Sequence, residues 1–441
     1  MAAFRKSTKL VVVAFVMLAA LSALFVIYGD CEEYDDSALL SEVAVIPDAD
    51  NACTWYTQAV DSMMFDMAQN DSIYRISIRE IWDEAFVVHC LEANRKVFPL
   101  VDAGNACLRF QAPAAPDASV PEPDWIQYYR VYRLLELKVL LDVAQHNSGE
   151  ALQDLLRMNA YVRRFEEGSS SVTHNAMGLI MLKRCEETLR YAVDAGVLDS
   201  GQQRELIDWK EQHPLTSLGE VRAWKSQFAM LKTLVDSAHA TARFPDGSDL
   251  GPFNDFSTAT FHRLFRLNRT KKLLAQKYER ILNQISTPYA QLSNSLPGLD
   301  DAPSGREGFS LFSLHLVPNR LGKYFVDAHV PVFGKTHHGR LFIQWEERAN
   351  LILMAMRVHH AQQDVPVRSL EQLTPGILAK VPDDPFGRGA ILYDSDLGSI
   401  RSVGLNRLDD HGSVELLEES LRVNLFKGQL DHLDLVLDLG R

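Results

Sequence analysis

The chain has 441 residues, of which 46% are hydrophobic, so it has enough apolar material for a sizeable core spread over two or three domains. This composition excludes a chain that is disordered by default. The formal net charge of −13 argues against general binding to nucleic acid, because attraction to phosphate needs a basic surface.

The N-terminus predicts a membrane anchor. Residues 10–28 form a run of 19 residues without a charge, about enough to cross a hydrocarbon core of roughly 30 Å. Basic residues precede this run within 1–9, and five acidic residues follow it between Asp30 and Asp36, at the start of the linker 29–47. This asymmetry predicts a single-pass protein of the inner (cytoplasmic) membrane, with a cytoplasmic N-terminus and the bulk of the chain extracytoplasmic. Cleavage of the anchor by signal peptidase is the alternative.

Residues 48–298 are expected to form a helical domain. Asn51 is a good cap for a helix in which apolar residues recur at helical spacing, and a second helix is expected over 78–102. Four prolines make 111–123 an extended connector.

The clearest helical pattern covers residues 125–242. Two antiparallel helices are expected around Ser148, and a third ends at Gly196. The spacing of Ser200 and Gln203 predicts a capping box, in which side chain and backbone satisfy each other's unpaired groups. A second capping box is predicted for another pair of residues, Ser217 and Glu220.

A further helix is expected to end at about Ser286, and it is basic in an otherwise acidic protein. Between Arg263 and Arg280 there are seven Lys or Arg residues and one acidic residue. An anionic lipid head group or wall polymer could bind this face, and a solvated helix face is the alternative. The residues proposed for that contact are Arg263, Arg266, Arg269, Lys271 and Lys272.

Residues 299–340 are predicted to form an irregular connector. Residues 341–441 are predicted to form a C-terminal region that begins with a helix over 341–363.

Neither cysteine nor histidine gives a strong metal signal. The five cysteines contain no C-x-x-C pair, and pairing among Cys53, Cys90 and Cys107 is plausible for an exported protein. Cys185 lies on a helical apolar stripe and is expected to be buried. Adjacent histidines at 337–338 and 359–360 point about 100° apart on a helix, so a zinc site would need other elements, with Glu346 or Glu347 as further ligands. The sequence has none of the short motifs of serine hydrolases, zinc proteases or P-loops.

Three segments of the first two thirds of the chain resemble a large family of uncharacterised, membrane-anchored bacterial helical proteins. The segments are PDADNACTWYTQAV, LEANRKVFPLVDAGNACLRF and NSGEALQDLL. The matching positions are Asn51, Ala52, Tyr56, Glu92, Ala93, Asn94, Arg95, Cys107, Arg109 and Ala151. This family carries no established activity, so the resemblance implies the anchor and the helical fold alone.

The C-terminal region is similar to the globular end of the major pseudopilins of type II secretion systems. The matching positions are Leu370, Leu373, Pro382, Asp384, Pro385, Phe386, Gly387, Tyr393, Ser402, Gly404, Asp409, Asp410 and Gly412. The chain departs from that family at His411 and Ser413, and its N-terminus lacks the processed pilin signature, so assembly into a pilus by that route is not expected.

The pseudopilin resemblance implies a calcium site. Calcium takes six to eight oxygen ligands, and Ser402, Asp409 and Asp410 are the candidates, completed by carbonyl groups near Gly404. The alternative is that the prolines and glycines shape turns and that the aspartates are solvated or cap backbone amides. The tail, residues 434–440, alternates apolar and polar residues and is expected to add an edge strand.

The expected fold is therefore mainly α: a transmembrane helix, an antiparallel helical array that is solenoid-like in part, and a small α+β pseudopilin-like cap. A non-catalytic scaffold or interaction protein of the bacterial envelope, with an envelope protein as partner, fits these features best. One alternative is an envelope hydrolase with a site between the array and the cap. The other is a calcium-dependent docking element.

Overall fold

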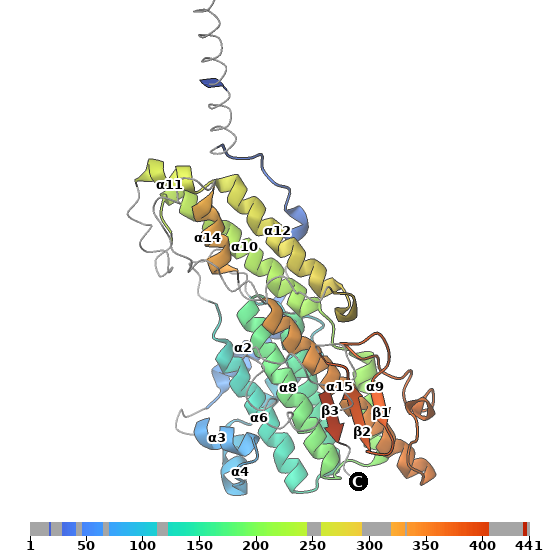
Figure 1. Cartoon of the computed structure of the whole chain (residues 1–441). Helices are drawn as coiled ribbons and strands as arrows, with labels where there is room; N and C mark the ends of the chain where they lie inside the picture. Colours follow the sequence, from blue (N-terminus) through green and yellow to red (C-terminus); the bar gives the residue numbers. More distant parts are fainter. Residues whose placement is uncertain are drawn as a thin grey trace, which may run out of the picture.

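The computed structural model describes residues 17–18, 29–40, 46–64, 70–112, 122–244, 257–292, 319–330, 333–404 and 435–438. It shows a mainly helical protein with a small antiparallel sheet near the C-terminus, which confirms the predicted helical class (Figure 1).

The N-terminal helices are short and lie on one side of the body. They are η1 (Ser37–Leu39), η2 (Asp48–Asp50), α2 (Ala52–Ser62), α3 (Asn70–Ser77), α4 (Glu84–Ala93) and α5 (Val97–Ala106). The Asn51 side chain accepts a hydrogen bond from the Cys53 N–H at 3.1 Å, so the predicted cap of α2 is confirmed. Helices α2 and α5 pack tightly against each other: an added Cβ at Gly104 would lie 2.2 Å from the Tyr56 ring.

The central array contains the long amphipathic helices that the sequence predicts for residues 125–242. They are α6 (Trp125–Ala144), α7 (Ser148–Glu167), α8 (Val172–Asp194), α9 (Ser200–Gln212) and α10 (Leu218–Thr241). Short turns connect α6 to α7 and α7 to α8, so these neighbours run antiparallel. Gly196 follows α8 with a φ of 67°, the left-handed conformation that favours glycine after a helix.

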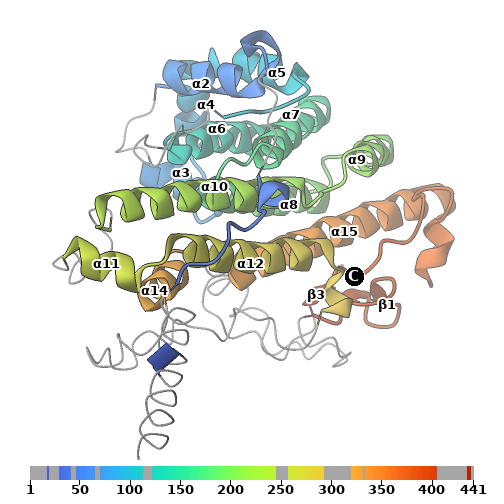
Figure 2. The same ribbon diagram turned by 90° about the horizontal axis from the view of Figure 1, so that it is seen from above.

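A second group of helices packs around its own hydrophobic core with α10. These elements are α11 (Thr258–Leu264), α12 (Leu267–Ser286) and α14 (Arg320–His329). The short η5 (Tyr289–Gln291) follows α12, and its Tyr289 belongs to the larger core of the central array. Figure 2 shows the helices in stacked rows, from α2 and α5 through α6 and α7 to α12 and α15.

The C-terminal elements are α15 (Phe333–Gln363), η7 (Leu370–Leu373), β1 (Leu392–Asp394), β2 (Ser399–Ser402) and β3 (Leu435–Asp438). The strand order is β1-β2-β3, all antiparallel, so the predicted edge strand in the tail is present as β3. We call residues 364–404 together with β3 the cap. Phe386, Ile391 and Ile400 of the cap belong to one core that also contains side chains of α2 and α5–α9.

The domain boundary predicted between residues 340 and 341 lies inside helix α15. The sequence reading put an irregular connector at 299–340 and started the last helix at 341, but α14 and the first turns of α15 lie within that connector. The glycines and histidines before Arg340 suggested a loop, but His337 contacts Glu220 of α10 and Arg340 pairs with Glu166 of α7, and these contacts override the weak helix propensity. Residues 299–318 lie outside the described residues.

Two other predicted helices are broken in the structure. The helix expected over 78–102 is two helices, α4 and α5, because the Asn94 side chain accepts from the Met64 N–H at 2.7 Å and donates to the Met64 carbonyl at 3.2 Å. The helix that ends at Ser286 begins only at Leu267, because the Asn319 side chain accepts the Arg266 N–H at 2.7 Å. In both places a distant asparagine binds the backbone and redirects the chain.

The predicted capping boxes were also wrong. The box at the start of α9 is formed by Asp199 and Gln202, one position before the predicted pair. At α10 the Ser217 side chain makes no capping bond, and Glu220 is buried instead of capping. The five cysteines are free thiols, so the suggested pairing among Cys53, Cys90 and Cys107 is not present.

Residues 30–39, which we call the strap, are docked on the helical body instead of forming a loose linker. Both oxygens of Asp30 accept backbone N–H groups of Asn268 and Arg269 at 3.0 Å, so Asp30 caps α12 from outside the helix. Further along, Leu39 is buried in the core of α10 and α12. The chain that follows the predicted anchor is thus fixed to the N-terminal end of α12.

Apart from Met17 and Leu18, the predicted span at 10–28 lies outside the described residues. No helix within the described ranges is long and apolar enough to cross a membrane. Met17 and Leu18 are both exposed.

Candidate functional site

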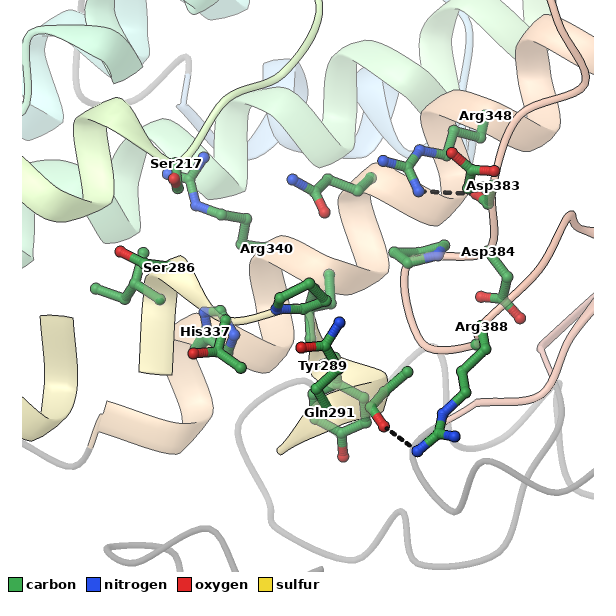
Figure 3. A pocket seen from close by; sticks show the side chains of 18 of the residues that line it. Ser217, Ser286, Tyr289, Gln291, His337, Arg340, Arg348, Asp383, Asp384 and Arg388 are labelled. Atoms are coloured by element: carbon green, nitrogen blue, oxygen red, sulfur yellow. Dashed lines mark hydrogen bonds between the residues drawn. The ribbon is translucent and has the colours of Figure 1, made fainter. Parts of the chain in front are cut away.

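A cleft of about 750 Å³ lies between the helical array and the cap (Figure 3). Its walls come from the start of α10, the end of α12 with η5, one face of α15, and the cap loop 383–389. The α15 residues that line it are His337, Arg340, Leu341, Gln344 and Arg348. Their spacing of three and four residues places them on a single stripe of the helix.

The cap wall of the cleft is organised by Asp384. Its buried carboxylate accepts from the Ser402 hydroxyl at 2.7 Å and from the N–H groups of Phe386 at 3.0 Å and Val403 at 2.9 Å. These three donors satisfy a charge that would be costly to bury alone. The carboxylate therefore holds the cap loop to the end of β2.

The bond between Ser402 and Asp384 affects one of the predicted calcium ligands. Ser402 is fully buried, and its hydroxyl is occupied by Asp384, which the sequence reading did not include among the ligands. Asp409 and Asp410 lie outside the described residues. Among the residues that the structure does describe, no group of three His, Cys, Asp or Glu side chains is placed to hold a metal ion.

The helical wall contains a buried charge cluster. Arg340 is 1% exposed and pairs with Glu166 and Glu220, which are both fully buried. Burial alone would lower the pKa of Arg340, but the two carboxylates outweigh it and raise that pKa. His337 adds to the cluster, with Nδ1 at 3.3 Å from both oxygens of Glu220. Burial lowers the pKa of the neighbouring His338 to about 4, so that imidazole is neutral at pH 7.

The cleft also contains an arginine without an acidic partner. Arg348 is partly buried, and its guanidinium donates to the backbone carbonyl of Asp383 at 2.7 Å. Burial lowers the pKa of Arg348, although Asp383 and Asp384 oppose this shift. Within the described parts of the chain, no carboxylate lies within ion-pair distance of Arg348, because Asp383 pairs with Lys380 at 2.7 Å and Asp384 is occupied by its three donors.

Arg388 reaches across the mouth of the cleft from the cap loop. It is exposed, and its guanidinium donates to the Ala290 carbonyl of η5 at 3.4 Å, a long bond (Figure 3). Gln291 and Gln344 line the same space with their amides, and Ser217 lines it with its hydroxyl. The cleft is thus a polar site to which α15 contributes the guanidinium of Arg348 and the cap loop that of Arg388.

A second buried charge network joins α15 to α8 and α9. The Lys210 ammonium lies 2.5 Å from Glu186, and both side chains are about 1% exposed. Asn350 of α15 donates to the same carboxylate at 3.0 Å, and Arg163 pairs with Glu347 close by. The sequence predicts neither buried network, because the partners of each ion pair lie on different helices.

The basic end of α12 has an anionic partner within the chain. The Tyr34 hydroxyl of the strap donates to Glu279 at 2.9 Å, and the Lys272 ammonium lies 5.8 Å from the centre of the Tyr34 ring. Lys271, one of the five residues proposed for an anionic surface, pairs with Asp236 at 2.6 Å. The acidic strap therefore already covers part of this basic helix, and contact of the remaining basic residues with an external anionic surface stays a prediction.

Neither family models, curated proteins nor solved structures gave a match to this chain. The two resemblances stated from the sequence therefore remain expectations, and function has to be inferred from the geometry.

Proposed function

We propose that this protein is a single-pass, membrane-anchored scaffold or interaction protein of the bacterial envelope, with its folded body outside the inner membrane. The observation that carries the proposal is the docked strap. Because Asp30 caps α12, the body is held within a few residues of the point where the predicted span ends. A rigid connection of this kind suits a protein that presents surfaces at a fixed height above a membrane.

The charge pattern and the first of the two sequence resemblances support the same proposal. Basic residues precede the apolar run and acidic residues follow it, which favours export of the body. The helical family that the three N-terminal segments resemble is membrane-anchored. The anionic contact of Arg263, Arg266, Arg269 and Lys272 belongs to this proposal, because these residues lie near the docked end of the strap.

An envelope hydrolase is the second candidate, and a specific observation favours it. The cleft lies at the predicted place between array and cap, and His337, held by Glu220, lines it. A carboxylate that orients an imidazole is a recurring arrangement in general base catalysis. Turnover of ester or glycan substrates by the purified chain, abolished by His337→Gln, would replace the scaffold proposal with this one.

The anchor predicts integral membrane behaviour. The full chain is expected to stay with the membrane fraction through washes with high salt and with alkaline carbonate, because burying nineteen uncharged residues in hydrocarbon is strongly favourable. The measurement is immunoblotting of pellet and supernatant after each wash. A matched variant with Val12→Asp and Leu21→Asp should move to the soluble fraction. Release of the unaltered chain by carbonate would contradict the anchor.

The calcium prediction is tested by thermal melting. If Asp409 and Asp410 hold calcium, EDTA should lower the melting temperature and added calcium should restore it, since a ligand bound only by the folded state stabilises that state. The control is Ser402→Ala. That variant should melt at a lower temperature with or without calcium, because the Ser402 hydroxyl is bonded to Asp384. If EDTA does not shift the melting temperature, the prediction of a calcium site is wrong.

A further inference from the structure

Arg348 is the group in the cleft whose charge is least compensated. The buried arginines Arg163 and Arg340 face carboxylates: Arg163 pairs with Glu347, and Arg340 with Glu166 and Glu220. Arg348 has one bond to a neutral carbonyl. A guanidinium removed from water without a counter-ion is costly, and a charged ligand can supply the missing partner.

The side chains near Arg348 leave its guanidinium available to a charged ligand. Asp384 lies beside it, but three donors hold that carboxylate toward the cap. Arg388 stands at the rim on the cap loop, and its long bond to the Ala290 carbonyl is weak enough to be exchanged (Figure 3). Each of the two guanidinium groups offers the forked pair of N–H donors that carboxylates and phosphates accept.

We propose that this cleft binds an oxyanion, a carboxylate or a phosphate, with Arg348 as its main partner and Arg388 as a second partner at the rim. A volume of about 750 Å³ exceeds the needs of a bare ion. The oxyanion therefore belongs to a larger polar molecule, whose amides and hydroxyls meet the side chains of Gln291, Gln344 and Ser217. This inference goes beyond the proposed function and does not depend on the membrane anchor.

The test is calorimetric titration of the purified full chain in detergent with two probes. One probe is the tripeptide Ala-Ala-Ala with a free carboxylate, compared with its C-terminal amide, and the other is inorganic phosphate. We expect one of the two oxyanions to bind and the amide to bind at least about tenfold more weakly, because charge-assisted bonds to a guanidinium are the strong ones. The probe that binds identifies the source of the oxyanion.

Three variants assign the binding to the cleft. Arg348→Gln should weaken binding by about tenfold or more, and Arg388→Gln by a smaller factor of about three, since Arg388 is more solvated. Arg368→Gln, an exposed arginine of the cap outside the cleft, is the matched control and should bind as the unaltered chain does. Because Arg388 is exposed, its variant keeps the test valid even if Arg348→Gln fails to fold.

Two results would overturn the inference. One is the absence of binding by both oxyanions, and the other is binding that neither Arg348→Gln nor Arg388→Gln weakens. Either result would leave the proposed anchoring untouched, since the carbonate washes test anchoring separately.

Discussion

Arg340→Met is expected to lower the free energy of unfolding by about 3–5 kcal/mol, because it leaves Glu166 and Glu220 as buried carboxylates without their cation. Methionine keeps much of the side-chain volume, so the loss reports the charge and not a cavity. Urea unfolding followed by circular dichroism measures the effect. Since Arg340 also bonds the Thr216 carbonyl, the start of α10 should lose protection from hydrogen exchange first.

The matched control for Arg340 is Arg75→Met. Arg75 pairs with Glu80 at 2.8 Å, but both side chains are about half exposed, so this substitution should cost less than about 1 kcal/mol. Equal effects of the two substitutions would show that the buried cluster does not hold α7, α10 and α15 together as described.

Lys210→Met should be comparably destabilising, at about 3 kcal/mol or more, because Lys210 neutralises Glu186 in the core between α8 and α9. Adding Glu186→Gln to this variant should recover at least about half of the loss, since the unpaired charge is then removed. An exposed lysine, Lys380, serves as the control. No recovery in the double variant would mean that packing, and not charge, causes the loss.

The Lys210 variant also has a predicted pH dependence. Burial would raise the pKa of Glu186, but Lys210, with the bond from Asn350, outweighs burial and sets that pKa below its ordinary value of 4.5. A depressed pKa contributes stability that is fully present above pH 4.5 and is lost as the pH falls through the folded-state pKa. The stability difference between the unaltered chain and Lys210→Met should therefore be full at pH 7 and shrink below about pH 4.5.

The sequence predicts the central helices well because their information is local. Apolar residues repeat every three or four positions between residues 125 and 242, and this pattern alone positions helices with one inward face. The ends of helices and the breaks between them were predicted poorly, because contacts with residues far away in the sequence determine them. Asn94 ends α4 by bonding Met64, 30 residues away, and Glu220 turns inward because Arg340 is there to meet it.

The sequence predicted the candidate cleft only in part. The sequence reading placed a site between array and cap, but the stripe of His337, Arg340, Gln344 and Arg348 was divided by a helix start set at residue 341. Helical spacing of polar residues was the signal that could have found it. The role of Asp384 could not be read locally, since its hydroxyl partner comes 18 residues later.

Labelling of Cys31 tests the central claim most directly, because it reports on which side of the membrane the folded body lies. Cys31 is partly exposed in the strap, and the other four cysteines are buried. A membrane-impermeant maleimide added to intact spheroplasts should therefore label the chain at Cys31, and Cys31→Ser should abolish the labelling. Labelling that appears only after the membrane is permeabilised would place the body in the cytoplasm and contradict the account.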